Sequence, residues 1–126
     1  MRLLLDTHAL IWALAQPRHL PVSAATAIRD SANSVAVSAA STWEIAIKAA
    51  LGKIAADLEE IVRAVRTLGF GELAVTVAHT TRLRQLPPHH RDPFDRILVA
   101  QALEDGFTIV THDRAFAAYA APILWR

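Results

Sequence analysis

Short apolar segments alternate with helical segments along the whole chain, and this alternation restricts the possible folds more than any other feature. Residues 2–5, 34–37, 72–75 and 107–110 are predicted to form short strands, with residues 121–124 as a candidate fifth strand at an edge. Because helices separate the strands, consecutive strands are expected to run parallel, with helices covering both faces of the sheet. We therefore predict an α/β fold around a central, mostly parallel sheet of four to five short strands.

The helices between these strands are marked by their caps and by the residues that end them. Asp92 and Pro93 form a typical helix start, and Gly106 closes the helix that they open. Another helix has two candidate N-caps, Ser38 and Ser41. The predicted helices are His8–Ala15, Ala24–Ala32, Ser38 or Ser41 to Leu51, residues 57–68, Ala78–Leu86 and a last helix from Asp92 to Asp105.

The composition describes a well-packed domain. With 126 residues, of which 53% are hydrophobic and 20% charged, the chain is expected to form one domain, residues 1–126. Cysteine is absent, which excludes disulfides, thiolate zinc sites and cysteine nucleophiles. No apolar stretch reaches the length of a membrane span and no signal-peptide pattern is present, so we expect a cytoplasmic protein without a membrane partner. The net charge of +1 does not by itself indicate nucleic-acid binding.

Four acidic residues stand near the ends of predicted strands or the starts of predicted helices: Asp6, Glu44, Asp95 and Asp113. Buried carboxylates are unfavourable unless they are paired or bind a cation. The carboxyl ends of parallel strands meet at one edge of a sheet, so these residues can converge although they are far apart in sequence. Several oxygen ligands in one crevice are what Mg²⁺ or Mn²⁺ requires. Metal-dependent phosphodiester hydrolysis is therefore the leading hypothesis.

Three of these residues also have a purely structural interpretation as helix caps. Asp6 and Asp113 could each cap a short helix. Asp95 lies three residues after Asp92, where its carboxylate favours a helix N-terminus and could complete a capping box. Four independent caps at one sheet edge would, however, bring like charges together unless cations neutralise them. The combination therefore favours a metal site over separate caps.

Glu44 has two structural interpretations of its own. It completes a capping box if its helix begins at Ser41, and it lies four residues before Lys48, a spacing that alone would give an ordinary surface ion pair. If the helix begins at Ser38, Glu44 lies further along the helix, and helix capping does not explain an acidic residue at that position.

A locally basic segment lies between His79 and Arg96. We interpret Arg84, Arg91 and Arg96 as candidate contacts for an anionic substrate whose reacting phosphate is held by metal. A solvated loop with ordinary surface arginines explains the same pattern.

Competing chemistries lack their motifs. There is no G-x-S-x-G elbow and no glycine-rich phosphate loop, and His89-His90 lacks the spacing of a zinc protease helix. His8 and His112 each lie beside a candidate site carboxylate, and for both a local hydrogen bond is favoured over phosphate binding or proton transfer. We attribute the three tryptophans to the core or an interface and not to base stacking: Trp12, Trp43 and Trp125.

The acidic residues lie in four motifs that together resemble those of the PIN-domain family. In chain order the motifs are LDTHALIW at residues 5–12, STWEIAIK at residues 41–48, HRDPFDR at residues 90–96 and VTHD at residues 110–113. This set is characteristic of VapC-type toxins of bacterial and archaeal toxin–antitoxin modules. Each motif alone is weak, but four in family order over nearly the whole chain make a specific match.

The resemblance implies a three-layer α/β/α domain that cleaves RNA with Mg²⁺, or with Mn²⁺ as a substitute. The matching positions for catalysis and metal binding are Asp6, Glu44, Asp95 and Asp113. The matching positions for supporting roles are Thr7, Asp92 and Thr111. The alternatives are a non-catalytic PIN-like domain that binds RNA or protein, and another metal-dependent phosphodiesterase or 5′-nuclease.

The resemblance also implies a homodimer that is inhibited by a cognate antitoxin. The residues independently point to association, because an alanine-rich, apolar chain of this length leaves more helical surface than one core can cover. We expect the partner surfaces at residues 24–32 and 58–68.

Overall fold

The computed structural model describes residues 1–88 and 92–125, and a five-stranded sheet lies at its centre. The strands are β1 (Arg2–Leu5), β2 (Ser34–Ser38), β3 (Gly71–Leu73), β4 (Thr108–Val110) and β5 (Ile123–Leu124). Their order across the sheet is β3-β2-β1-β4-β5, and all neighbouring strands are parallel. The α/β prediction is confirmed, and the sheet is wholly parallel where a mostly parallel one was expected.

Helices fill the connections between the strands. They are α1 (Thr7–Ala15), α2 (Val22–Arg29), α3 (Ala39–Ala50), α4 (Leu58–Thr67), α5 (Val77–Arg82) and α6 (Pro93–Asp105). Short 3₁₀ turns cover Pro17–His19, Leu83–Gln85 and Arg114–Ala118. None of the helices in the described ranges has the length and apolar character needed to cross a bilayer.

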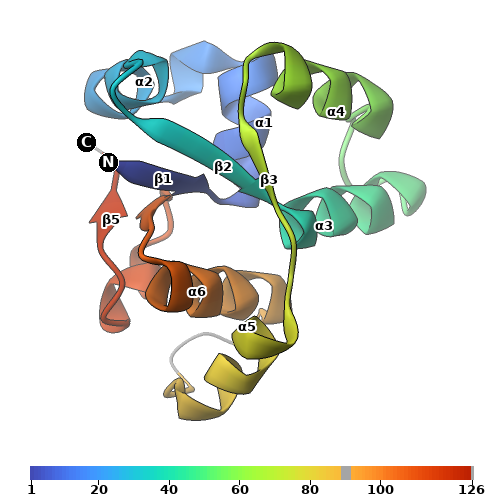
Figure 1. The fold of residues 1–126 in the computed structure, drawn as a ribbon. Helices are drawn as coiled ribbons and strands as arrows, with labels where there is room; N and C mark the ends of the chain where they lie inside the picture. Colours follow the sequence, from blue (N-terminus) through green and yellow to red (C-terminus); the bar gives the residue numbers. More distant parts are fainter. Residues whose placement is uncertain (89–91, 126) are drawn as a thin grey trace.

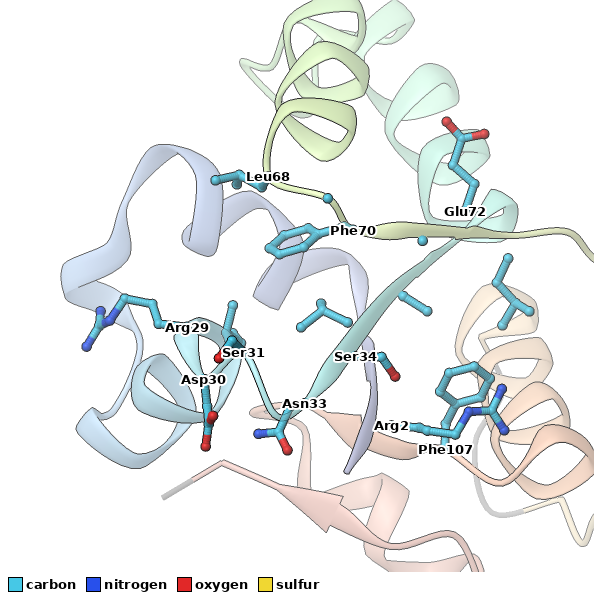
Figure 2. Close-up of a pocket in the computed structure, with 16 residues that line it drawn as sticks. Arg2, Arg29, Asp30, Ser31, Asn33, Ser34, Leu68, Phe70, Glu72 and Phe107 are labelled. Atoms are coloured by element: carbon cyan, nitrogen blue, oxygen red, sulfur yellow. The ribbon is translucent and has the colours of Figure 1, made fainter.

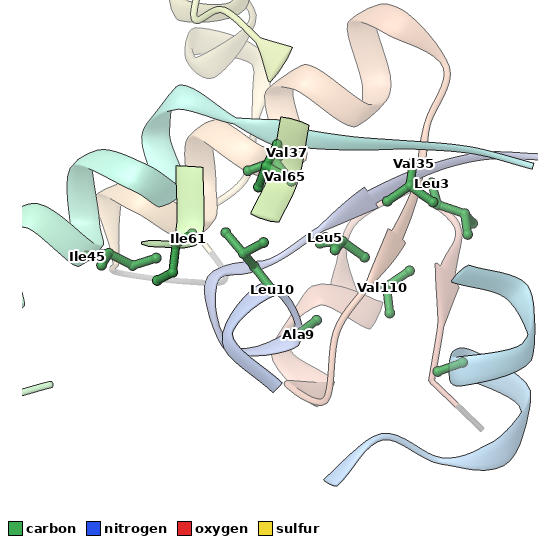
Figure 3. Close-up of a cluster of buried hydrophobic side chains, with 11 residues drawn as sticks. Leu3, Leu5, Ala9, Leu10, Val35, Val37, Ile45, Ile61, Val65 and Val110 are labelled. Carbon is green, nitrogen blue, oxygen red and sulfur yellow. The ribbon is translucent and has the colours of Figure 1, made fainter. Parts of the chain in front are cut away.

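The side chains of β1, the central strand, alternate between the two faces of the sheet, and a separate hydrophobic cluster covers each face. Leu3 and Leu5 belong to a cluster to which α1, α2, α3 and α4 contribute (Figure 3). Leu4 points to the other face and belongs to a cluster with Leu98 of α6. All three leucines are fully buried. Figure 1 shows the resulting three layers, which the motif resemblance predicts.

The second helix ends earlier than predicted. α2 stops at Arg29 rather than continuing to Ala32, because one side chain binds the backbone just beyond the helix and another binds a carbonyl in its last turn. The Asp30 carboxylate accepts a hydrogen bond from the N–H of Ala32 at 2.9 Å, and the Asn33 amide donates to the carbonyl of Ala27 at 3.0 Å. Local side-chain bonds of this kind compete with a further helical turn.

The helix predicted over residues 78–86 is also shorter. It is α-helical only as α5 and continues as the 3₁₀ turn Leu83–Gln85, after which Leu86 is extended. Pro87 disfavours helical geometry for the residue before it, so the helix cannot continue through Leu86.

Candidate metal centre

The acidic residues predicted for the site lie at the carboxyl edge of the sheet. Asp6 directly follows β1, and Asp113 follows β4, the neighbour of β1. Glu44 lies on α3, which begins directly after β2 on the other side of β1. Asp95 lies in the first turn of α6, the helix that leads back to the start of β4. The sheet order therefore brings residues separated by up to about a hundred positions to one edge (Figure 1).

Asp6 is the N-cap of α1, and its side chain is 5% exposed. One carboxylate oxygen accepts a hydrogen bond from the N–H of Ala9 at 2.8 Å, and the other accepts from the hydroxyl of Thr111 at 2.6 Å. Burial raises the pKa of Asp6 above its usual value, and the charge of Asp113 adds to this effect. The two hydrogen bonds and the nearby His8 favour the charged form and oppose the shift.

Glu44 is 4% exposed because α3 begins at Ala39 and carries it inward. Ser38 is the N-cap, with its hydroxyl accepting from the N–H of Ala40 at 3.0 Å. The alternative in which the helix begins at Ser41 with a capping box to Glu44 is wrong. Ser41 lies inside the helix, fully buried, and its hydroxyl has no hydrogen-bond partner among the described residues.

Two donors hold the Glu44 carboxylate. The hydroxyl of Thr7 donates to Oε1 at 2.6 Å, and the Lys48 ammonium lies 2.5 Å from Oε2. The hydrogen bond to Glu44 raises the pKa of Lys48, and the charges of Asp92 and Asp95 add to this effect, while partial burial opposes it. The pair that the sequence presents as an ordinary surface contact therefore involves a buried carboxylate, and its lysine lies in the field of three acidic residues.

Asp92 is the N-cap of α6, as predicted. Its carboxylate accepts hydrogen bonds from the N–H groups of Phe94 at 2.8 Å and Asp95 at 3.2 Å, with Pro93 at the first helical position. This cap fixes the helix turn that carries Asp95. The ring of Phe94 lies edge-on to that of Trp43, 5.0 Å between centroids, which joins the start of α6 to α3.

Thr111 connects the ends of β1 and β4. Its hydroxyl donates to Asp6 and accepts a hydrogen bond from the N–H of Asp113 at 3.0 Å. The Asp113 carboxylate in turn caps the following 3₁₀ turn by accepting from Ala115 at 2.9 Å. The two threonines predicted to support the site, Thr7 and Thr111, thus each donate a short hydrogen bond to a buried carboxylate.

The three predicted substrate arginines are placed differently. Arg84 is exposed on the 3₁₀ turn after α5. Arg96 donates to the carbonyls of Leu86 and Pro87 and to the hydroxyl of Tyr119, so it holds the segment before α6 in place. Arg91, with His89 and His90, lies outside the described residues. A role for these arginines in substrate binding stays a prediction.

Sequence reasoning missed two features of this edge. The first is that Lys48 lies among the acidic residues of the site, paired with Glu44 and close to Asp92 and Asp95. The i, i+4 spacing from Glu44 was the sequence signal for this position. The second is a group of aromatic rings around Trp12, for which the i, i+4 spacing of His8 and Trp12 was the available signal. Trp43 is 62% exposed. Of the two roles predicted for it, packing in the core is therefore wrong, and contact at an interface stays a prediction.

The carboxylates suit a divalent cation chemically but are not assembled around one position. Among residues 1–88 and 92–125, no three acidic or histidine side chains lie close enough together to hold a metal ion as they stand. Asp6 interacts with Asp113, and Glu44 is paired with Lys48. The donors are all oxygen atoms, which Mg²⁺ and Mn²⁺ prefer. The Lys48 ammonium already acts as a cation for Glu44 and would compete with a metal for that carboxylate.

The chain belongs to the PIN domain family, whose sequence model matches residues 3–122. The family predicted from the four motifs is therefore confirmed. Among curated relatives, the chain is 32% identical to ribonuclease VapC22 of Mycobacterium tuberculosis over 126 residues, which covers 94% of this chain and 92% of the relative.

Solved structures share the fold at lower sequence identity. VapBC2 from Rickettsia felis, bound to a DNA fragment from its promoter, matches with a TM-score of 0.73 at 15% identity over 100% of both chains. FitAcB from Neisseria gonorrhoeae matches with a TM-score of 0.62 at 20% identity, over 97% of this chain and 96% of that chain. VapBC-1 from nontypeable Haemophilus influenzae gives 0.56 at 17% identity, over 98% and 97%. These matches establish the three-layer α/β/α architecture.

Proposed function

We propose that this chain is a divalent-metal-dependent endoribonuclease and acts as the toxin of a toxin–antitoxin module. The observation that carries the proposal is the burial of Asp6, at the end of β1, and of Glu44, on the helix that follows β2, with Asp113 beside the first and Lys48 beside the second. Buried carboxylates at one sheet edge require compensating positive charge. The sequence similarity to ribonuclease VapC22 supports RNA as the substrate.

Asp6, Glu44, Asp95 and Asp113 are the proposed metal ligands. Mg²⁺, when bound, orients a phosphate and lowers the pKa of a water molecule. The residues of the chain supply the rest of the mechanism. Thr111 and Thr7 orient the carboxylates of Asp6 and Glu44 through their hydrogen bonds, as outer-shell donors commonly do. The Asp92 cap holds the first turn of α6, and with it Asp95, at the edge of the sheet.

Incubation of the purified protein with labelled single-stranded RNA and the matching DNA tests this proposal. Reactions are run with Mg²⁺, with Mn²⁺ or with EDTA. Internal cleavage of RNA that requires a metal supports the proposal. Removal of nucleotides from one end indicates a 5′-nuclease instead, and binding without cleavage indicates a non-catalytic domain.

Arg84 and Arg91 are proposed to bind substrate phosphates. Replacing either arginine with alanine should weaken RNA binding and reduce its dependence on salt, because fewer counterions are released. Titrations of Arg84→Ala at several salt concentrations measure this directly. An unchanged slope would assign Arg84 to ordinary solvated surface.

An antitoxin segment is the proposed occupant of an apolar groove between α1, α2 and the segment that follows α4. A cavity of about 520 Å³ is lined by Ala25 and Ile28 of α2 and by Leu68 and Phe70, which lie beyond the end of α4. Of the two segments expected to form partner surfaces, residues 24–32 line this groove, whereas residues 58–68 reach it at Leu68 alone, because the apolar face of α4 is packed in the core. The groove shares Ile28, Arg29, Leu68 and Phe70 with a cavity of about 700 Å³ at the amino edge of the sheet (Figure 2). Structural similarity to VapBC proteins supports this partner.

Co-expression with the neighbouring small open reading frame tests the antitoxin. The wild-type chain should co-purify with that product and lose RNA cleavage in the complex, because a basic residue of the bound partner is expected to reach the carboxylates and displace the metal. Ile28→Asp places a charge in the groove, far from the carboxylates, and should release the partner while cleavage by the free chain is retained.

The outer face of α3 supports the proposed homodimer. Trp43, Ile47 and Leu51 follow one another at four-residue spacing and are 62%, 37% and 64% exposed. Exposed apolar stripes of this kind are typical of association surfaces. Light scattering should show a dimer for the wild type and a monomer for Ile47→Glu. A wild-type monomer would remove the dimer from the proposal.

A further inference from the structure

Aromatic rings gather beside the candidate metal centre, and the proposed hydrolysis uses none of them. Trp12 on α1 lies at the centre of the group. Its ring centroid is 5.7 Å from that of His8, 5.5 Å from His19, 6.1 Å from His112 and 5.6 Å from Trp125. The rings of His112 and Trp125 also meet edge-on at 5.5 Å. Residues from α1, from the turn after it, from the segment after β4 and from the end of the chain thus form one cluster.

A cavity of about 410 Å³ opens between part of this cluster and the acidic residues. Its lining residues are Asp6, His8, Trp12, His112, Asp113 and Arg114. The volume falls within the range of roughly 300–1,000 Å³ that is typical of small-ligand sites. Aromatic rings, two carboxylates and a guanidinium therefore border the same space.

We propose that this cavity receives an unstacked nucleobase of single-stranded RNA, next to the phosphate that is cleaved. Proteins that bind single strands stack bases on Trp and His rings, which tolerates different bases because every base has a π face. A base among His8, Trp12 and His112 places its adjoining phosphate towards Asp6 and Asp113, where the proposed metal is held. For Trp12 this replaces the interpretation from the sequence alone, which did not favour base stacking. This inference rests on the proposed function, and it specifies that the substrate is single-stranded at the cleavage site.

A structural role explains part of the ring cluster but not the cavity. The contact of Trp12 with Trp125 ties α1 to the segment after β5, and His19 covers another part of the indole. Neither function requires His8 and His112, which are exposed and line the cavity. His19 touches Trp12 without being among the lining residues. His19→Ala therefore disturbs the ring cluster without removing a wall of the cavity, and it is the matched control for His112→Ala.

Binding of single-stranded RNA with abasic positions tests the proposal. The probe is a labelled oligonucleotide in which each nucleotide in turn lacks its base, and binding is measured by fluorescence anisotropy with Mg²⁺ present. All proteins carry Asp95→Asn, which removes one carboxylate charge and the expected cleavage. In this background, one abasic position should weaken binding about ten-fold or more. His112→Ala should reduce that penalty, because one of the three rings that contact the base is already gone while His8 and Trp12 remain.

The control variants make the result specific. His19→Ala and Trp12→Phe should keep the abasic penalty, the first because it leaves the cavity intact and the second because it retains an aromatic face. An equal penalty with and without His112, a penalty at no position, or no binding of RNA would each overturn the inference. The cleavage reaction separates this from the proposed function. If the chain cleaves RNA with metal but the abasic penalty does not depend on His112, the base site is wrong and the proposed nuclease function stands. If the penalty depends on His112 but the chain with Asp95 intact does not cleave RNA, the nuclease function is wrong and the base site stands.

Discussion

Asp6 and Glu44 are almost equally buried, at 5% and 4% exposed, but their charges are compensated differently. Glu44 is paired with the ammonium of Lys48. The hydrogen bonds to Asp6 come from the hydroxyl of Thr111 and the N–H of Ala9, both of which are neutral. Accordingly burial raises the pKa of Asp6 in spite of those two bonds.

The difference indicates how a cation would enter the site. On the Asp6 side it would add positive charge beside a carboxylate whose two hydrogen bonds from the described residues come from neutral donors, so binding there relieves the cost of desolvation. On the Glu44 side it would compete with the ammonium of Lys48. In the metal-free protein, the buried charge of Asp6 is therefore expected to lower stability, whereas the charge of Glu44 is balanced by Lys48. The following variants separate these two cases.

The largest expected effect is the loss of cleavage in Asp6→Asn and Glu44→Gln. Removing a proposed metal ligand should lower the rate of RNA cleavage by at least about a hundred-fold in both variants. Their metal-free stabilities should differ in sign. Asn retains the cap of α1 and removes a desolvated charge, so unfolding of Asp6→Asn should require as much denaturant or more. Glu44→Gln deprives Lys48 of its partner and should unfold at lower denaturant concentration.

Asp30→Asn is the matched control for these variants. It makes the same chemical change at an exposed carboxylate at the opposite edge of the sheet, and Asn can still accept from Ala32. Cleavage should be unchanged. Full activity in Asp6→Asn would remove the metal centre, and equal stability changes in both site variants would remove the comparison.

Lys48→Met is expected to have the next largest effect. Among the residues that the structure describes, the variant leaves the Thr7 hydroxyl as the donor to the buried Glu44 carboxylate, which should cost about 1–3 kcal/mol in the metal-free protein. Its affinity for Mn²⁺ should rise, because no ammonium competes for the carboxylate. Calorimetric titration with Mn²⁺ and unfolding with and without the metal measure both effects. Lys53→Met, at an exposed lysine beyond α3, should change neither. Unchanged affinity would show that Lys48 does not compete for the site.

Local signals in the sequence predicted most of the fold. The apolar run Leu3-Leu4-Leu5 indicates a buried strand, and Asp92-Pro93 indicates a helix start, because each depends only on neighbouring residues. The rule that the carboxyl ends of parallel strands meet at one edge, together with the family motifs, then predicts that the four acids converge. These predictions did not need the strand order, which depends on pairing between distant segments and was supplied by the structure.

Features that depend on packing could not be predicted in the same way. Ser38 and Ser41 are both good N-caps, and the choice between them depends on Ser41 being fully buried inside α3. The spacing of Glu44 and Lys48 is visible in the sequence, but the burial of Glu44 arises because α3 packs against α1, where Thr7 lies. Arg96 has the sequence appearance of a free surface cation, yet it donates to two backbone carbonyls, which carry no sequence signature, and to the distant hydroxyl of Tyr119.

The two threonines give a smaller test of the same comparison. Thr111→Val removes the donor to Asp6 and the acceptor of the Asp113 N–H, whereas Thr7→Val removes one donor to Glu44 and leaves Lys48 in place. We expect Thr111→Val to lose about 1–3 kcal/mol of metal-free stability and Thr7→Val to lose less. Denaturant unfolding in EDTA measures both. The reverse order would mean that Lys48 does not protect Glu44.

The smallest expected effect is a dependence of metal-free stability on pH that comes from Asp6. Its pKa in the folded state is raised above the usual value of 3.8, so the folded chain binds the proton more readily than the unfolded chain. The stability that this proton contributes is complete below about 3.8 and is lost as pH rises through the raised folded pKa. Lowering the pH from 7 towards 4 in EDTA should therefore stabilise the wild type relative to Asp6→Asn, by at most about 1.4 kcal/mol per pH unit.

Saturating Mg²⁺ should reverse this difference, because the metal binds the carboxylate and the proton then competes with it. The wild type would lose stability relative to Asp6→Asn as the pH falls. Subtracting the variant's curve removes the titration of groups remote from Asp6, which both proteins share, whereas His8 and Asp113 interact with Asp6 and contribute to the difference. If the stability difference between the wild type and Asp6→Asn does not vary with pH in EDTA, burial does not raise the pKa of Asp6. A difference of the same sign with and without Mg²⁺ would mean instead that Asp6 does not hold the metal.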